Sequence, residues 1–173
     1  VYGGLLSSSF HRAGTLGVAK DLGSIGALAV DITHSRATID SATPYVTKGQ
    51  SYAIKYGKSF HTNTHLRFAG YRYSTQGYRD FEETLRERSH DRHYMGSRRS
   101  RLEASVYQNI GRSSTINLSF SHQDYWQTSY VQRQFQFTLS SQHNAVTYNL
   151  SASQSLSANR LDSDRQISIG VSF

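Results

Sequence analysis

The chain has 173 residues and a net charge of +7, and only 36% of its residues are hydrophobic. This length predicts a single domain, but the polar composition argues against a large dry core. The chain contains no cysteine, which excludes disulfides and cysteine-ligated metal sites. The Lys and Arg residues are scattered, and their densest segment, residues 79–101, also carries five Asp and Glu residues, so we do not expect nucleic acid as a partner.

Alternation of apolar and polar residues predicts β-strands along most of the chain, because successive side chains of a strand point to opposite faces. Twelve tyrosines and a single proline also favour strands over helices. No apolar run is as long as a membrane-spanning helix, which needs about eighteen residues or more. Ten strands are predicted, over residues 1–10, 15–20, 28–33, 52–57, 66–73, 101–107, 114–126, 134–139, 146–153 and 166–173.

The connections between these strands alternate in length from the second strand onward. Short turns follow strands two, four, six and eight, whereas longer loops follow strands three, five, seven and nine. The longest loop, residues 74–100, is expected to hold one helical turn, since Phe81 and Leu85 lie four residues apart. Outer-membrane β-barrels have this asymmetry, with tight periplasmic turns and longer outer loops. The pattern therefore favours an all-β, antiparallel, up-and-down transmembrane β-barrel over a soluble β-sandwich binding module.

The strand at residues 114–126 illustrates the two faces that such a barrel requires. Its apolar residues alternate with Asn and Ser, and it ends in a polar-tipped aromatic pair. In the apolar positions of this strand and of a later one, we predict lipid-facing residues: Ile116, Leu118, Phe120, Phe135, Phe137 and Leu139. Charged residues inside strands are predicted to face the lumen: Asp31, Lys55, Arg67, Arg101 and Glu103. Aromatic residues near the long loops are predicted to form an interfacial girdle: Tyr71, Tyr73, Tyr125, Trp126 and Tyr130.

The alternation is ambiguous at Gly70, where a β-bulge would exchange the two faces of the strand. Leu66 and Phe68 continue the apolar alternation before this point, whereas the faces of the residues after Gly70 stay open.

Several segments resemble the translocation barrel of fimbrial outer-membrane ushers, the pore proteins of the chaperone–usher pathway. They occur in the family's order and cover nearly the whole chain: LGSIGALAVD (22–31), GQSYAIKYGKSF (49–60), GYRYSTQGY (70–78), SFSHQDYW (119–126) and QISIGVSF (166–173). The resemblance is to the block of strands that follows the plug domain. It implies a single β-barrel domain over residues 1–173, corresponding to part of an usher pore, without the plug or the periplasmic domains.

The resemblance also implies a function in the bacterial outer membrane. Ushers export and assemble folded pilus subunits without nucleotide hydrolysis, and their partners are chaperone–subunit complexes, bound mainly by domains that have no counterpart here. Ten strands place both ends of the sheet on the short-turn side, so the chain either closes alone by pairing residues 1–10 with residues 166–173 or is a slice of a larger usher barrel. A closed barrel of ten strands would be nearly filled by its own side chains and would not pass a folded subunit.

Other functions are weighed against this hypothesis. A small outer-membrane barrel enzyme remains an alternative because Asp and His residues occur in the outer loops: Asp80, His90, Asp91, His93 and Asp124. None of them forms a recognised catalytic or metal-ligand spacing, so we expect no enzyme activity, cofactor or metal. The partners expected at the surface are outer-membrane lipid and lipopolysaccharide, whose phosphates suit the arginines of the longest loop: Arg86, Arg88, Arg92, Arg98, Arg99 and Arg101.

Overall fold

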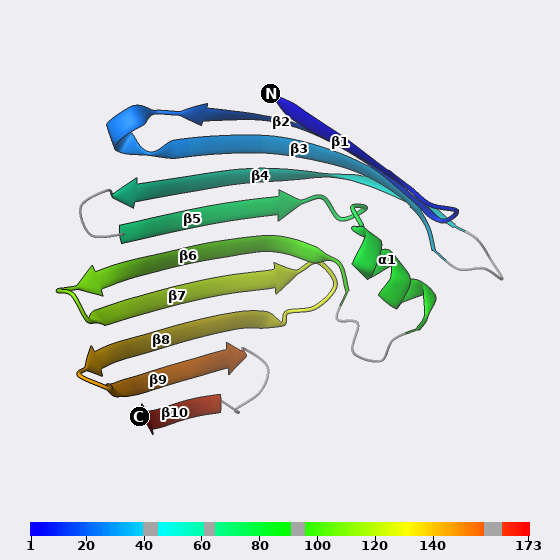
Figure 1. The fold of residues 1–173 in the computed structure, drawn as a ribbon. Helices are drawn as coiled ribbons and strands as arrows, with labels where there is room; N and C mark the ends of the chain where they lie inside the picture. Colours follow the sequence, from blue (N-terminus) through cyan, green and yellow to red (C-terminus); the bar gives the residue numbers. More distant parts are fainter. Residues whose placement is uncertain (40–44, 61–64, 91–95, 158–163) are drawn as a thin grey trace.

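The chain forms one curved β-sheet with a single α-helix at one end (Figure 1). A computed structural model describes residues 1–39, 45–60, 65–90, 96–157 and 164–173. The strands are β1 (Tyr2–Ser7), β2 (His11–Asp21), β3 (Ala27–Thr38), β4 (Val46–Phe60), β5 (His65–Ser74), β6 (Arg98–Ile110), β7 (Ser114–Tyr125), β8 (Val131–His143), β9 (Val146–Ser157) and β10 (Asp164–Ser172). The helix is α1 (Phe81–Arg88), and a short 3-10 turn, η1 (Gly23–Ile25), joins β2 to β3.

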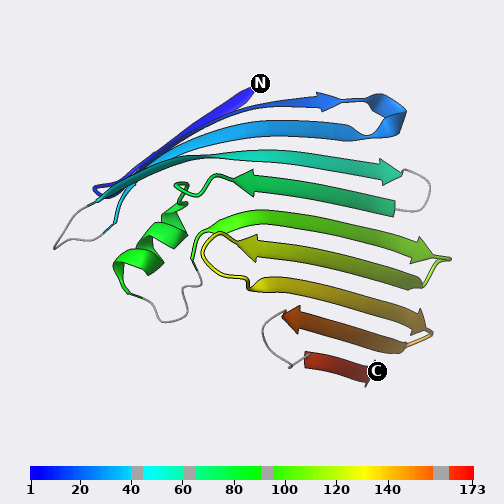
Figure 2. The ribbon, with the colours of Figure 1, turned by 180° about the vertical axis from the view of Figure 1, so that it is seen from behind.

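The ten strands are hydrogen-bonded in the order of the sequence, and every neighbouring pair is antiparallel. This confirms the predicted number of strands and the up-and-down topology. Of the two alternatives, closure by pairing of the first and last strands is not observed, because β1 and β10 lie at opposite edges of the sheet (Figures 1 and 2). An even number of antiparallel strands permits closure, but the curvature of this sheet does not bring its edges together.

The connections separate into two groups at the two ends of the sheet. At one end, short connections link β2 to β3, β6 to β7 and β8 to β9, and Gly111 and Asn144 adopt positive φ angles of 63° and 55° in the last two. At the other end lie the segment that forms α1 and the connections from β3 to β4 and from β7 to β8, together with the three-residue turn between β1 and β2. The predicted helical turn at Phe81 and Leu85 is therefore confirmed as the two-turn helix α1.

The pairing register assigns each residue to a face, because directly opposite residues of two strands point the same way. Ile116 pairs with Leu139 and Leu118 pairs with Phe137, so these apolar residues share one face. Ser119 pairs with Gln136 on the other face. The first face is called the apolar face below, and the second is called the polar face.

No second layer covers the apolar face in the part of the chain that is described. Large hydrophobic residues remain exposed on it, from Val30 and Ile54 to Ile169, which is 77% exposed. A β-sandwich requires two packed sheets with their apolar faces together, so this architecture differs from the soluble alternative.

Gly70 does not introduce a bulge, because β5 pairs with β4 and with β6 without any shift of register. Phe68 and Gly70 both lie on the polar face, where the Phe68 ring lies over the glycine: a Cβ atom at Gly70 would be 3.3 Å from that ring. Arg67 is consequently paired with Val106 on the apolar face, and its predicted place among the lumen-facing charges is wrong. The apolar Phe68 had suggested the opposite orientation for this strand.

Candidate functional site: the polar face and its helix

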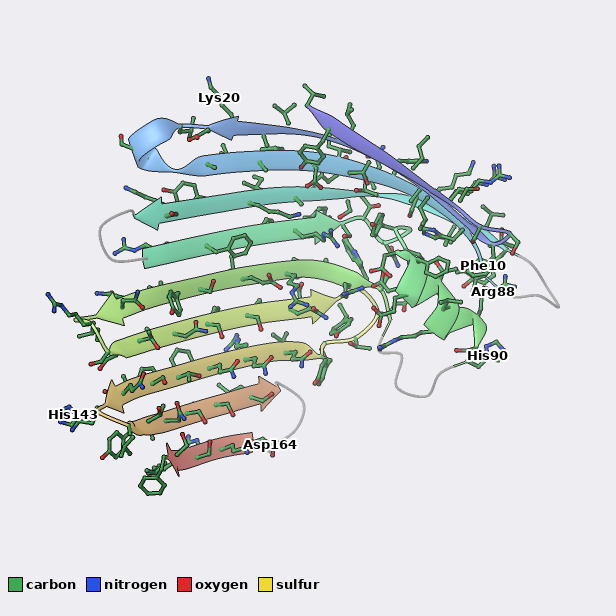
Figure 3. The ribbon with its side chains drawn as sticks, viewed as in Figure 1. Phe10, Lys20, Arg88, His90, His143 and Asp164 are labelled. Carbon is green, nitrogen blue, oxygen red and sulfur yellow. The ribbon has the colours of Figure 1, made fainter. Side chains whose placement is uncertain are left out.

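The most buried part of the molecule lies where α1 meets the polar face of β2, β3 and β4. The Phe10 ring, in the turn between β1 and β2, stacks on Phe81 of α1 with 5.6 Å between the ring centroids. The Arg88 guanidinium lies 4.8 Å from the centre of the Phe10 ring (Figure 3). The Arg88 Nη1 atom also donates a 2.7 Å hydrogen bond to the carbonyl oxygen of Thr38, at the end of β3. These contacts fix both ends of the helix against the sheet.

Local sequence explains why α1 forms at this point. The Asp80 side chain accepts a 2.7 Å hydrogen bond from the backbone nitrogen of Glu83, and the Glu83 side chain accepts one of 3.1 Å from the backbone nitrogen of Asp80. This reciprocal capping box satisfies amide groups that the first helical turn leaves free. Arg86 and Arg88 lie in the last turn, where positive charge complements the helix dipole.

Arg98, the first residue of β6, joins the start of the sixth strand to the capping box. Its guanidinium pairs with Asp80, and its Nε atom lies 3.1 Å from Glu83 Oε1. The same Glu83 oxygen accepts a 3.0 Å hydrogen bond from the backbone nitrogen of Arg98. The Glu83 residue is only 6% exposed, so loss of Arg98 would leave a buried carboxylate without its charge partner.

Arg79 anchors the entrance to the helix from the other side. Its backbone nitrogen donates to Ser35 Oγ at 3.2 Å, and its carbonyl oxygen lies 2.9 Å from His11 Nε2. Its guanidinium pairs with Glu87 at 2.6 Å. Arg79, Ser35 and His11 are all buried, so the polar face at this end of the sheet is held together by polar contacts.

Two glycines allow the backbone of the segment after β5 to cross β4 at close range. A Cβ atom at Gly49 would lie 2.1 Å from the backbone nitrogen of Tyr78, and one at Gly77 would lie 2.1 Å from the carbonyl oxygen of Lys48. Thr47 Oγ1 donates a 2.7 Å hydrogen bond to the carbonyl oxygen of Gly77. The crossing buries Tyr78, and this burial raises the pKa of its phenol, so the side chain stays neutral at physiological pH.

Four of the five predicted lumen-facing charges share the polar face. Lys55 lies 3.8 Å from Asp31, and Arg101 forms an ion pair with Glu103. The fifth, Arg67, lies on the apolar face, as described above.

Arg72 was missed by the sequence analysis because it follows the ambiguous position Gly70. It lies directly opposite Arg101 on the polar face. A shallow pocket on this face is lined by both arginines together with Lys55, Arg98 and Glu103. Lys55 pairs with Asp31, Arg101 pairs with Glu103, and Arg98 pairs with Asp80 and Glu83, so Arg72 is the cation of this lining that has no ion pair among the described residues.

The predicted aromatic girdle divides into two groups. Tyr73 meets Trp126 edge-on, with 6.2 Å between the ring centroids, and Trp126 Nε1 donates to the carbonyl oxygen of Ser74 at 2.8 Å. Tyr71 is on the same face of β5 as Tyr73. Tyr125 instead packs on Tyr130, and its hydroxyl accepts a 2.6 Å hydrogen bond from Gln123. The six predicted lipid-facing residues, by contrast, all lie together on the apolar face.

The Asp and His residues considered for catalysis are engaged in structural contacts where they are described. Asp80 pairs with Arg98, and Asp124 pairs with Arg99 at 2.6 Å. His90 Nδ1 lies 3.3 Å from the carbonyl oxygen of Glu87, while Asp91 and His93 lie outside the described residues. Among the described residues, no three His, Asp or Glu side chains gather in a way that would hold a metal ion. The described helices are also too short and polar to cross a membrane.

Comparison with known proteins identifies the family to which this chain belongs. A family model described as outer membrane usher protein matches residues 1–173. This chain belongs to the outer membrane usher family. The usher chain is 32% identical to the usher FimD of Escherichia coli K12, over 100% of its own length and 22% of FimD. It is 34% identical to the Escherichia coli usher FocD, again over 100% of its length and 22% of that protein.

Solved structures extend the likeness from sequence to fold. The translocation pore of the P pilus usher, PapC, superimposes with a TM-score of 0.73 at 28% identity. The match covers 97% of the usher chain and 34% of the PapC chain. The usher chain therefore spans about a fifth of FimD and FocD and about a third of the solved pore.

Replacing Gly49 by alanine is expected to loosen the segment that leads into α1, because the added methyl group would overlap the Tyr78 backbone. Overpacking of this kind destabilises by about 1–3 kcal/mol. Gly57 is a matched control on the same strand, since a Cβ atom there would lie 3.9 Å from its nearest neighbour, the Arg67 carbonyl oxygen. Hydrogen exchange of the helix amides should rise in Gly49→Ala and stay unchanged in Gly57→Ala. Equal protection in both variants would contradict the close crossing.

Arg98→Gln is expected to release α1 from β6, because it leaves the buried Glu83 carboxylate without its charge partner. Removing one member of a buried ion pair costs about 3–5 kcal/mol, and we expect less here because Arg98 is partly exposed. Arg86→Gln is the control, since the Arg86–Glu82 pair is exposed on the helix surface. Limited proteolysis should cut near α1 faster only in Arg98→Gln. Identical cleavage rates in the two variants would show that Arg98 does not hold the helix.

Proposed function

We propose that this chain forms part of the wall of an usher-type pore that exports and assembles pilus subunits across the bacterial outer membrane. The observation that carries the proposal is a single-layer sheet with two chemically different faces, of which α1 covers part of the polar one, and the topology of a solved usher pore. In this proposal, the apolar face meets lipid and the polar face lines the lumen.

The open edges of the sheet indicate how the wall is completed. Unpaired backbone groups in hydrocarbon cost several kcal/mol each, so a membrane sheet must close on itself or pair with further strands. Apolar side chains at both edges are exposed, with Leu5 on β1 at 93% and Ile167 on β10 at 74%. We infer that β1 and β10 pair with additional strands of the usher-type barrel. A barrel with these additional strands is wider than a closed barrel of ten strands. The passage of a folded subunit requires this greater width.

The position of α1 has a consequence for the lumen. The helix and the segment that crosses Gly49 lie against the polar face at the long-loop end of the sheet (Figures 1 and 2). In a pore built from this wall, they lie inside the lumen and narrow it at that end. By analogy with other ushers, the substrates in this proposal are folded pilus subunits delivered by chaperones. The proposal assigns no catalytic step to any residue.

A matched pair of neighbouring substitutions tests the assignment of the two faces. Leu118→Arg places a charge on the lipid side, which costs about 2–4 kcal/mol near the bilayer midplane. Ser119→Arg places the same charge on the lumen side, where water solvates it. In cells that depend on this protein for pilus assembly, Leu118→Arg should reduce the amount of folded protein in the outer membrane and the number of pili. Ser119→Arg should leave the folded amount unchanged. Equal folded amounts would overturn the assignment.

Arg72, a cation on the polar face without an ion pair among the described residues, predicts the ion preference of the pore. Arg72→Glu reverses one charge beside Lys55 and Arg101, so the preference for anions over cations should decrease. Lys58→Glu makes the same charge change on the apolar face, at the short-turn end of β4, and serves as the control. Reversal potentials of the intact protein in planar bilayers under a salt gradient measure the preference. Identical potentials for the two variants would exclude this part of the polar face from the conducting path.

A further inference from the structure

Three cationic side chains form a row across the apolar face at the long-loop end of the sheet. Arg12 on β2 lies directly opposite Arg36 on β3, and Arg36 lies directly opposite Lys48 on β4. Directly opposite residues of neighbouring strands have Cβ atoms about 5 Å apart and point the same way. Figure 3 shows nitrogen-tipped side chains extending from this end of β2 and β3, on the far side from α1.

The protein does not neutralise this row. All three residues are exposed, and within the described part of the chain none of their side chains takes part in an ion pair or hydrogen bond. Like charges directly opposite each other destabilise a sheet, and here the repulsion occurs twice in succession. It is relieved when negative charge from outside the chain binds to the row.

The surroundings of the row define the kind of anion that fits. Four residues further along the same strands and on the same face, Leu16 lies opposite Ile32, which lies opposite Tyr52. The next row of that face contains Val18, Val30 and Ile54. Four residues of a strand span about 13 Å. The cationic row is therefore at the rim of an apolar surface, within reach of a molecule that has an anionic head and hydrocarbon chains.

The opposite rim of the apolar surface also carries cations, but Lys58 and Arg67, which lie directly opposite each other there, both have partners within the protein. There Lys20 lies opposite Leu28, which lies opposite Tyr56. Among the described residues of β2, β3 and β4, a row of three directly opposite cations therefore occurs at the long-loop end and not at the short-turn end. At the long-loop end, Thr38 also lines a shallow pocket together with Arg12 and Arg36, which adds a hydroxyl group as a hydrogen-bond donor.

We propose that Arg12, Arg36 and Lys48 bind the phosphate groups of a phosphorylated glycolipid, the lipid A part of lipopolysaccharide, in the leaflet on the long-loop side. The inference rests on the proposed function, in which the apolar face meets lipid. The planar guanidinium groups of Arg12 and Arg36 suit bidentate contacts with phosphate oxygens, and Lys48 adds a point charge. The acyl chains lie over the rows that begin with Leu16 and Val18.

The test measures binding of bisphosphorylated lipid A to the intact protein in detergent, by native mass spectrometry over a range of lipid concentrations. Near an anionic membrane surface, each Lys or Arg adds favourable binding free energy. Replacing all three residues by Gln should therefore weaken the binding of lipid A about 100-fold. The control carries Lys20→Gln, Lys58→Gln and Arg112→Gln, which remove the same charge at the short-turn end, and it should bind lipid A like the parent protein. Arg36→Gln alone should weaken binding about fivefold and serves if the triple variant does not fold.

Two further arms identify the source of the phosphate. Lipid A without its phosphates should bind the parent protein as weakly as the triple variant binds intact lipid A. Millimolar inorganic phosphate should not displace lipid A, because it lacks the acyl chains. Equal affinities of the triple variant and the control, full displacement by inorganic phosphate, or tight binding of the dephosphorylated lipid would each overturn the proposal.

The outcome is separable from that of the proposed function. If the triple variant still binds lipid A tightly while Leu118→Arg and Ser119→Arg differ as expected, the lipid site is wrong and the membrane wall stands. If Leu118→Arg and Ser119→Arg behave alike, the assignment of the apolar face to lipid fails, and the site loses its basis.

Discussion

The structure depends on a register that is maintained without a slip along most of the sheet. Side chains alternate every residue, so a shift of one residue in one strand would transfer all its apolar side chains to the polar face. The single irregularity among the ladders lies at the start of β6, between Arg98 and Ser100, next to the point where Arg98 binds the capping box of α1. The shift thus occurs at the long-loop end, outside the rows that carry the large apolar residues.

Polar contacts at the long-loop end compensate for the absence of a hydrophobic core. The buried residues of the described structure include His11, Ser35, Thr84 and Arg79, whereas large apolar residues are exposed on the opposite face. Buried polar residues and exposed apolar residues are expected when lipid, rather than a second layer of protein, covers the apolar surface. The capping box of α1, the close crossing at Gly49 and the Phe10–Phe81 contact together order the long loop against the polar face.

Most of the fold was predictable from the sequence because its signals are local. The alternation around Ile116 and Leu118 identified both the strand and its faces, and the spacing of Phe81 and Leu85 identified the helix. The errors have a common physical origin in cross-strand geometry. The orientation of β5 depends on Phe68 covering Gly70, a contact on the polar face that the hydrophobicity of Phe68 alone argues against. Arg67 was assigned to the wrong face for this reason, and Arg72 was overlooked.

The sequence by itself determined the strands, the alternation of short and long connections and the membership of the usher family, since each is encoded by neighbouring residues or by motifs in order. Only the tertiary structure decided that the sheet is open and that Arg98 forms ion pairs with the capping box of α1. It also decided that Arg12, Arg36 and Lys48 form one row. These features join residues that are distant in the chain. They depend on register and sheet curvature, which are set by all the strands together and not by any one segment.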